Sequence, residues 1–131
     1  MDLDQEGQAL QTEDVRGVWL HGLPGTGKSH KARTDYPDAY IKAQNKWFDG
    51  YVGESAIILD DFDCKELGQY LKIWADKWPC SGEIKGGKVN LRHKAFIITY
   101  NYHPTDLWEG ALCEAIVRRF QITRMLITHT K

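Results

Sequence analysis

The sequence predicts an α/β fold, a mostly parallel sheet flanked by helices, and three observations support this prediction. Short apolar runs such as AIIL and AFIIT are continuous rather than alternating, as in strands that are covered on both faces. Segments with a helical apolar period separate these runs. A glycine-rich phosphate-binding motif joins the first run to the first helical segment. Together they indicate a P-loop NTPase.

Length and composition fit one globular domain. The chain has 131 residues, of which 42% are hydrophobic and 27% are charged. No apolar run approaches the ~20 residues of a membrane-spanning helix, and the N-terminus lacks the features of a signal peptide. We therefore expect an intracellular protein without membrane contact. Three cysteines without C-x-x-C spacing argue against a zinc site or a disulfide framework. Residues 1–14 are acidic, without apolar period, and are predicted to be a linker or a truncated end.

The elements are predicted from apolar period and turn residues. Strands are expected at residues 15–20, 39–41, 56–59, 95–100 and 122–128. Helices are expected after Ser29, at about 65–77 and at about 111–120. In the second of these an apolar stripe runs from Leu67 to Trp78, and Pro79 ends the helix. Between Glu83 and Arg92, two short extended pieces flank Gly86-Gly87, which predicts a hairpin with a type I′ turn.

The strongest chemical signal is the pattern G-x-x-x-x-G-K-S between the first strand and the first helix. Its glycines let backbone N–H groups surround the phosphates of ATP. The lysine is expected between the β- and γ-phosphates, and the serine hydroxyl is expected to bind Mg²⁺. The eight residues are Gly22, Leu23, Pro24, Gly25, Thr26, Gly27, Lys28 and Ser29.

Polar side chains follow two further strands. Asp60 and Asp61 come directly after the run at 56–59, where α/β sheets place their ligands. Because side chains alternate along a strand, the two acids take different roles. Asp60 is expected to hold Mg²⁺, directly or through water, and Asp61 to orient or deprotonate the attacking water. Asn101, after the strand at 95–100, is a candidate for positioning that water and for sensing the γ-phosphate.

Basic residues gather around the predicted hairpin. The net charge of the chain is -1, but five acidic residues lie in positions 1–14, which contain no Lys or Arg. Residues 82–94 carry four basic side chains against one acid. Such a cluster is either a solvated face or a nucleic-acid contact. The candidates for contact with nucleic acid are Lys85, Lys88, Arg92, His93 and Lys94.

Two adjacent arginines, Arg118 and Arg119, end the last predicted helix. Either the pair is solvated and neutralised by Glu114, or one of them contacts a γ-phosphate as an arginine finger. Adjacent helical residues point about 100° apart, so only one can enter a given phosphate site. We expect that residue to be Arg119, with Arg118 as the alternative.

The order of these motifs resembles the superfamily 3 helicase domain of replication initiator (Rep) proteins of circular single-stranded DNA viruses such as circoviruses and nanoviruses. The segment NKWFDGY at 45–51, followed by Gly53-Glu54, is similar to the NKWWDGY-x-GE stretch of that family. The resemblance covers about residues 18–120 and makes 15–131 a superfamily 3 helicase domain.

The resemblance implies an AAA+ type of P-loop fold with an inserted basic β-hairpin. It also implies an ATP- and Mg²⁺-dependent helicase in the host nucleus, translocating 3′ to 5′. The partners that it implies are single-stranded DNA and further copies of the chain in a hexameric ring. Hairpins would line the central channel of that ring, and each subunit would donate an arginine to its neighbour's site.

The chain departs from the family in two respects. Its five histidines never occur at i, i+2, so the metal motif of the Rep endonuclease is missing. We also expect the oligomerisation segment upstream of residue 15 to be absent or truncated, which puts assembly of a stable ring in question. Trp47, Phe48 and Tyr51 either stack on bases or pack inside the fold, and packing is the expectation.

Other functions remain to be weighed. A small P-loop kinase would transfer a phosphoryl group to a metabolite, but it usually carries an Arg-rich lid, whereas 82–94 is Lys-rich. A GTPase is excluded because no N-K-x-D base reader follows the acidic pair. A slowly hydrolysing, ATP-gated assembly scaffold is the non-enzymatic alternative.

Overall fold

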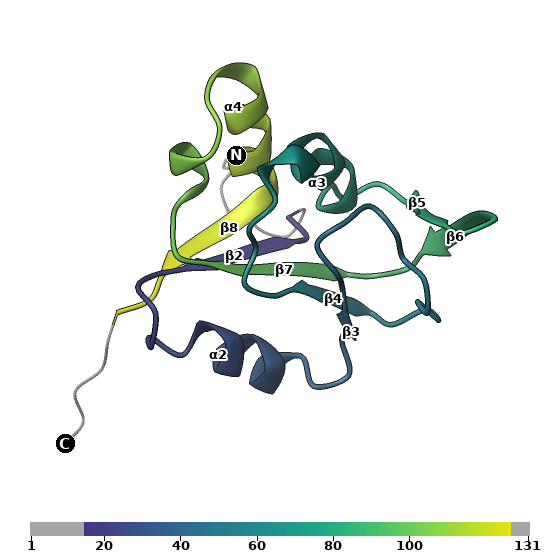
Figure 1. Cartoon of the computed structure of the whole chain (residues 1–131), viewed down its shortest axis with the longest axis horizontal. Helices are drawn as coiled ribbons and strands as arrows, with labels where there is room; N and C mark the ends of the chain where they lie inside the picture. Colours follow the sequence, from purple (N-terminus) through teal and green to yellow (C-terminus); the bar gives the residue numbers. More distant parts are fainter. Residues whose placement is uncertain (1–14, 127–131) are drawn as a thin grey trace, which may run out of the picture.

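The computed structural model describes residues 15–126, so the predicted linker at 1–14 and the last five residues lie outside the described part. Its centre is a parallel sheet with the strand order β3-β4-β7-β2-β8 (Figure 1). The predicted α/β class is confirmed. The strands are β2 (Gly17–His21), β3 (Tyr40–Ile41), β4 (Ala56–Leu59), β7 (Ala95–Tyr100) and β8 (Phe120–Arg124).

Helices cover both faces of this sheet (Figure 1). On one face, Ala32 of α2 (Lys28–Asp35) packs against Ile58 and Ile97. On the other face, α3 (Gly68–Trp74) and α4 (Gly110–Arg119) pack against the alternate strand residues. All four residues of β4 are buried, which explains why its sequence is a continuous apolar run. The short 3₁₀ helices are η1 (Lys65–Leu67) and η2 (Pro104–Asp106).

Two predicted elements differ in extent from the observed ones. The helix expected over 65–77 starts as η1 and ends at Trp74, so Trp78 lies beyond it and is 65% exposed. Pro79 disfavours helical geometry only in Trp78, the residue before it, so it does not explain why the helix already ends at Trp74. The last strand starts at Phe120, because it pairs with β2 from Gly17↔Phe120 onward. The end of that predicted strand, at 127–128, lies outside the described residues.

The predicted hairpin is present, but its turn is shifted. Strands β5 (Cys80–Ile84) and β6 (Gly87–Leu91) form a separate antiparallel two-stranded sheet. Ile84 pairs with Gly87, so the two turn residues are Lys85 and Gly86 rather than the two glycines. Gly86 has φ 92°, but the φ of Lys85 is not positive, because Asp61 is the only non-glycine residue with positive φ among residues 15–126. The turn is therefore not type I′, which requires positive φ at both central positions.

The segment that follows β3 packs against this hairpin. Phe48 is fully buried and its N–H donates to the carbonyl of Glu83 at 2.8 Å. The Asp49 carboxylate accepts from the N–H of Lys85 at 3.0 Å. Tyr51 is 6% exposed. The expectation that these aromatic residues pack inside the fold is thus confirmed for Phe48 and Tyr51.

The parallel sheet has two chemically different edges. The carboxyl ends of β2, β4 and β7 meet at one edge. The hairpin leads into the amino end of β7 and extends away from the opposite edge (Figure 1). Within residues 15–126 no helix is long and apolar enough to cross a bilayer.

Candidate active site

The phosphate-binding loop joins the carboxyl end of β2 to the first turn of α2. Gly25 and Gly27 both have φ 86°, a left-handed conformation that L side chains rarely adopt. A Cβ at either position would meet no atom within 4 Å, so the backbone conformation, and not lack of space, calls for glycine. The Thr26 hydroxyl donates to the carbonyl of Leu23 at 2.9 Å and closes the loop. The first backbone N–H groups of α2, which have no acceptor within the helix, therefore lie beside this loop.

Lys28 lies inside the loop. It is 9% exposed, and its Nζ donates to the carbonyls of Gly22 at 3.0 Å and Leu23 at 3.1 Å. These are weak acceptors compared with the charged oxygens of a phosphate. A phosphate that entered the loop would therefore replace the two carbonyls as the acceptor of hydrogen bonds from the ammonium group.

A cavity of about 520 Å³ brings the predicted site residues together. The loop contributes Pro24, Gly25 and Gly27, and the first turn of α2 adds Lys28, Ser29 and His30. Asp60 and Asp61 enter from the end of β4, and Thr99 and Asn101 from the end of β7. Because β7 lies between β2 and β4, Asn101 stands between the loop and the acidic pair. The arrangement can hold a triphosphate with acids and an amide on one side of it.

Asp60 is held by three donors. The hydroxyls of Thr99 and Ser29 donate to its Oδ1 at 2.6 and 2.7 Å, and Arg33 pairs with Oδ2 at 3.1 Å. Burial acts to raise the pKa of Asp60, but these hydrogen bonds and the charge of Arg33 outweigh it and hold that pKa below the usual value. The side chain is therefore a carboxylate at neutral pH, as a ligand for a cation must be.

The oxygens of Ser29 and Asp60 fit Mg²⁺. Mg²⁺ is usually bound by one or two carboxylates together with substrate phosphates rather than by an all-protein cage. Among residues 15–126 no cluster of three His, Cys, Asp or Glu side chains offers such a cage. Bound between Ser29, Asp60 and the phosphates, the ion would neutralise charge on the phosphate oxygens.

Asp61 has an unusual backbone. Its φ of 54° places it in the left-handed region, which non-glycine residues occupy at a cost that is smaller for Asp and Asn than for most others. The hydroxyl of Thr99 accepts from its N–H at 2.7 Å. The exposed Asp61 and the partly buried Asp60 line the same cavity. Asp60 is held by three donors, whereas Asp61 makes no side-chain hydrogen bond among residues 15–126.

Gln44 and Thr99 support this turn, and the sequence analysis missed both. The Gln44 amide donates to the carbonyls of Asp60 at 2.9 Å and Asp61 at 3.1 Å, and it accepts from the N–H of Asp63 at 3.0 Å. Thr99 could have been found, because β4 and β7 pair Leu59 with Ile98 and so place Thr99 beside Asp60. Nothing in the sequence around Gln44 indicates its contact.

We expect Gln44→Ala to lower kcat for ATP hydrolysis about 10- to 100-fold with little change in KM. The substitution removes three hydrogen bonds that hold the acidic turn but none that the loop makes with phosphates, and a shift of about 1 Å in a catalytic group can cost about 100-fold. Steady-state kinetics measures both constants. Gln69→Ala on the exposed side of α3 is the matched control. An unchanged kcat would show that Gln44 does not position the acids.

The two arginines at the end of α4 have different surroundings. Arg119 pairs with Asp76 at 3.3 Å and donates to the carbonyl of Ala115 at 2.9 Å, while Arg118 is exposed. The structural ion pair thus belongs to Arg119, which was our first candidate for the finger. Arg118, the alternative candidate, is the one whose side chain is exposed and makes no ion pair among residues 15–126.

Neither arginine lies at its own nucleotide cavity. Helix α4 ends where Phe120 pairs with Gly17, at the amino edge of the sheet. The cavity lies at the carboxyl edge, one length of β2 away, which is about 16 Å for five residues at about 3.3 Å each. An arginine side chain cannot cover that distance, so a finger from this helix has to serve another subunit.

The basic candidates fall into two groups. Lys85 and Lys88 lie at the hairpin tip, and Arg92 and Lys94 lie in the exposed loop between β6 and β7. His93 is different. It is 3% exposed, and its Nε2 donates to the carbonyl of Trp74 at 2.6 Å. Burial lowers the pKa of His93, which is therefore a neutral core residue, and its assignment as a nucleic-acid contact is wrong.

Comparison with known proteins agrees with this geometry. A family model described as RNA helicase matches residues 18–81. The replication-associated protein of Goose circovirus is 38% identical over 95 residues, and that of Porcine circovirus 1 is 37% identical over 98 residues. This chain is a relative of the circovirus replication-associated proteins.

The matches cover 70% and 72% of this chain, and 32% and 31% of those two relatives. The replication-associated protein of Human associated cyclovirus 1 is 34% identical over 118 residues, which is 82% of this chain and 42% of that relative. The chain therefore spans about a third of the length of the first two relatives. The family expected from the order of the motifs is confirmed, and with it a helicase-like, nucleotide-binding domain.

Proposed function

We propose that this chain is an ATP-hydrolysing motor domain of the superfamily 3, AAA+ type, which moves along single-stranded DNA as part of a ring of identical subunits. The observation that carries the proposal is the division of the molecule into two edges. The phosphate loop, both acids and Asn101 share one cavity at the carboxyl edge. The basic hairpin and Arg118 lie toward the amino edge, away from that cavity.

The residues of the cavity divide the work of hydrolysis. The loop amides and Lys28 bind the phosphates, and Ser29 and Asp60 hold Mg²⁺. Asp61 accepts a proton from the attacking water or orients it, since its side chain lines the same cavity as Lys28 and Ser29. Asn101 contacts that water or the γ-phosphate oxygens from the end of β7. Water is therefore the acceptor in this proposal, and a kinase is not favoured because the relatives are replication-associated proteins.

The proposed assembly of several subunits rests on the position of Arg118. The side chain is exposed and lies about one strand length from its own cavity, so it can complete only the site of a neighbour. The hexameric ring, the 3′ to 5′ direction and the location in the host nucleus rest on the resemblance alone.

The comparisons give different indications of which nucleic acid the domain binds. The family model carries the description RNA helicase, whereas the curated relatives are replication-associated proteins of circoviruses. Lys85 and Lys88 would contact phosphates, which RNA and DNA share. We propose DNA, and equal stimulation by RNA would make the domain a general single-strand motor.

ATP turnover with and without single-stranded DNA, at several protein concentrations, tests the proposal. We expect DNA to stimulate turnover and the rate per subunit to rise with concentration, because the finger comes from a neighbour. Lys28→Ala, which removes the cation at the phosphates, is the inactive control. Turnover that responds neither to DNA nor to concentration would contradict a motor, and phosphoryl transfer to a metabolite would establish the kinase.

Replacing Lys85 and Lys88 together with Ala is expected to weaken binding of single-stranded DNA about equally for all sequences. Phosphate contacts carry no sequence information, and each lost contact removes about 0.7 from the slope of log affinity against log salt. Fluorescence anisotropy at several salt concentrations measures both effects. The control is the double variant Lys65→Ala and Lys72→Ala, which removes the same charge from η1 and α3 instead of from the hairpin. Unaltered affinity at low salt would exclude the hairpin tip from the DNA site.

A further inference from the structure

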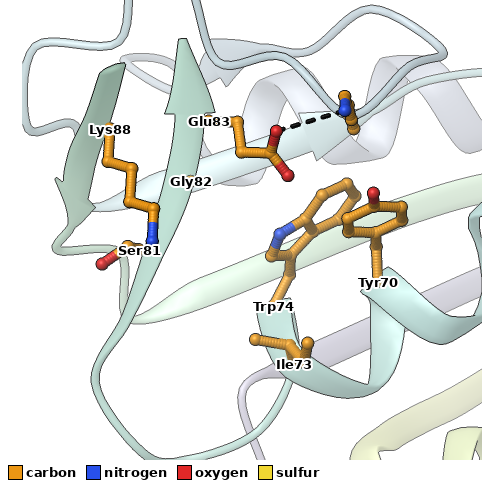
Figure 2. A pocket seen from close by; sticks show the side chains of 8 residues that line it. Tyr70, Ile73, Trp74, Ser81, Gly82, Glu83 and Lys88 are labelled. Atoms are coloured by element: carbon orange, nitrogen blue, oxygen red, sulfur yellow. Dashed lines mark ion pairs between the residues drawn. The ribbon is translucent and has the colours of Figure 1, made fainter.

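A second cavity, of about 160 Å³, lies between α3 and the hairpin (Figure 2). Helix α3 forms one wall with Tyr70, Ile73 and Trp74, and strand β5 forms the other with Ser81 and Glu83. The side chains of Lys46 and Lys88 also line it. It shares no residue with the nucleotide cavity.

The size of this cavity matches one aromatic ring. An apolar cavity of about 150 Å³ in another protein takes up benzene. The cavity here is about 160 Å³, close to the volume that one six-membered ring fills, and it is partly open to solvent. Strand β5 lies close to the ring of Phe48 here, because a Cβ on Gly82 would collide with that ring. The hairpin is therefore seated on the fold and does not close this space.

The walls offer both apolar surface and a hydrogen-bond donor. Tyr70 and Trp74 are stacked with ring centroids 5.2 Å apart, and Ile73 is 51% exposed. Trp74 is only 2% exposed, yet Figure 2 shows its indole nitrogen directed toward the space beside Ser81. Within residues 15–126 this N–H donates to no protein acceptor, and it is open to solvent at the cavity. A ligand with an acceptor oxygen in the cavity could therefore accept a hydrogen bond from this N–H.

The charges around the cavity suit a nucleic-acid backbone. Lys88 faces Glu83 across the hairpin, and Glu83 is paired with Lys46 at 3.2 Å. Lys88 also belongs to the hairpin tip. A strand whose phosphates contact Lys85 and Lys88 therefore passes the mouth of the cavity with its bases within reach of it.

We propose that this cavity binds one unstacked pyrimidine base of the single strand that the hairpin holds. The ring lies against Ile73 and Tyr70, and the N–H of Trp74 donates to a carbonyl oxygen of the base. Lys46 and Lys88 contact the flanking phosphates. The proposal rests on the proposed function for the strand, and it adds a preference for pyrimidines that phosphate contacts cannot provide.

Binding of labelled oligonucleotides of equal length tests this site. We expect the wild-type chain to bind oligothymidylate about tenfold more tightly than oligodeoxyadenylate or an abasic strand, since one base contact is worth about that factor. Ser81→Phe fills the cavity from an exposed strand position and should abolish the difference while leaving the salt dependence intact. Gln69→Phe, exposed on α3 outside the cavity, adds the same ring and should retain the difference.

A direct measurement accompanies the variants, with thermal unfolding as the check that Ser81→Phe folds. Irradiation of oligothymidylate containing 5-iodouracil should cross-link wild-type protein at Tyr70 or Trp74, as mapped by mass spectrometry. Equal, salt-dependent binding of all strands, or cross-links confined to other residues, would overturn the pyrimidine site and leave the motor proposal standing. Failure of the wild type to bind any strand would overturn both.

Discussion

Replacing Asp61 with Asn is expected to leave ATP binding intact and to lower ATP turnover by about 10²- to 10⁴-fold. The carboxylate of Asp61 lines the nucleotide cavity but makes none of the bonds that hold Asp60 to Ser29 and Thr99. The substitution thus removes a proton acceptor and leaves the cation ligands in place. Asparagine also tolerates the left-handed φ of 54° at this position, so the turn should persist. Equilibrium binding of a fluorescent ATP analogue and steady-state turnover separate the two effects.

Asp63→Asn is the matched control for this experiment. Asp63 is exposed two residues further along the same turn and does not line the cavity. Its variant should retain normal turnover. If Asp61→Asn also turned over ATP at the wild-type rate, the division of labour between Asp60 and Asp61 would be incorrect.

Arg118→Ala is expected to bind ATP normally and to lose about 10³- to 10⁵-fold in turnover, the usual effect of losing an arginine finger. Mixing this variant with Lys28→Ala should restore activity, because one protein supplies intact phosphate loops and the other intact fingers. The reason is geometric, since Arg118 lies at the amino edge of its own sheet and the cavity at the carboxyl edge. The mixture is assayed at concentrations where wild-type subunits demonstrably assemble.

Arg119→Ala is the control for the finger. It loses the ion pair with Asp76, a partly exposed pair that contributes at most about 1 kcal/mol, and it should keep its turnover. If Arg119→Ala instead lost turnover and was complemented by Lys28→Ala, Arg119 would be the finger. If mixing restored neither variant in assembled samples, no arginine of this helix would act between subunits.

Local patterns were sufficient for much of the fold and of the nucleotide site. The continuous apolar runs of β4 and β7 predicted a parallel sheet, because strands that are covered on both faces are apolar throughout. The spacing of the phosphate loop and the acids at the end of β4 located the cavity, because parallel strands bring their carboxyl ends to one edge. These features follow from residues that are neighbours in the chain or repeat with a fixed period.

Contacts between distant segments were decided by the tertiary structure alone. His93 is adjacent to two exposed basic residues, yet packing against α3 buries it. The sequence does not distinguish Arg118 from Arg119, and only the ion pair with Asp76 gives Arg119 a different environment. Gln44 contacts the acidic turn from 16 residues away, and the indole nitrogen of Trp74 points toward the cavity between α3 and the hairpin. Sequence period states which face of an element is apolar, but which side chains meet across that face depends on how the elements are packed.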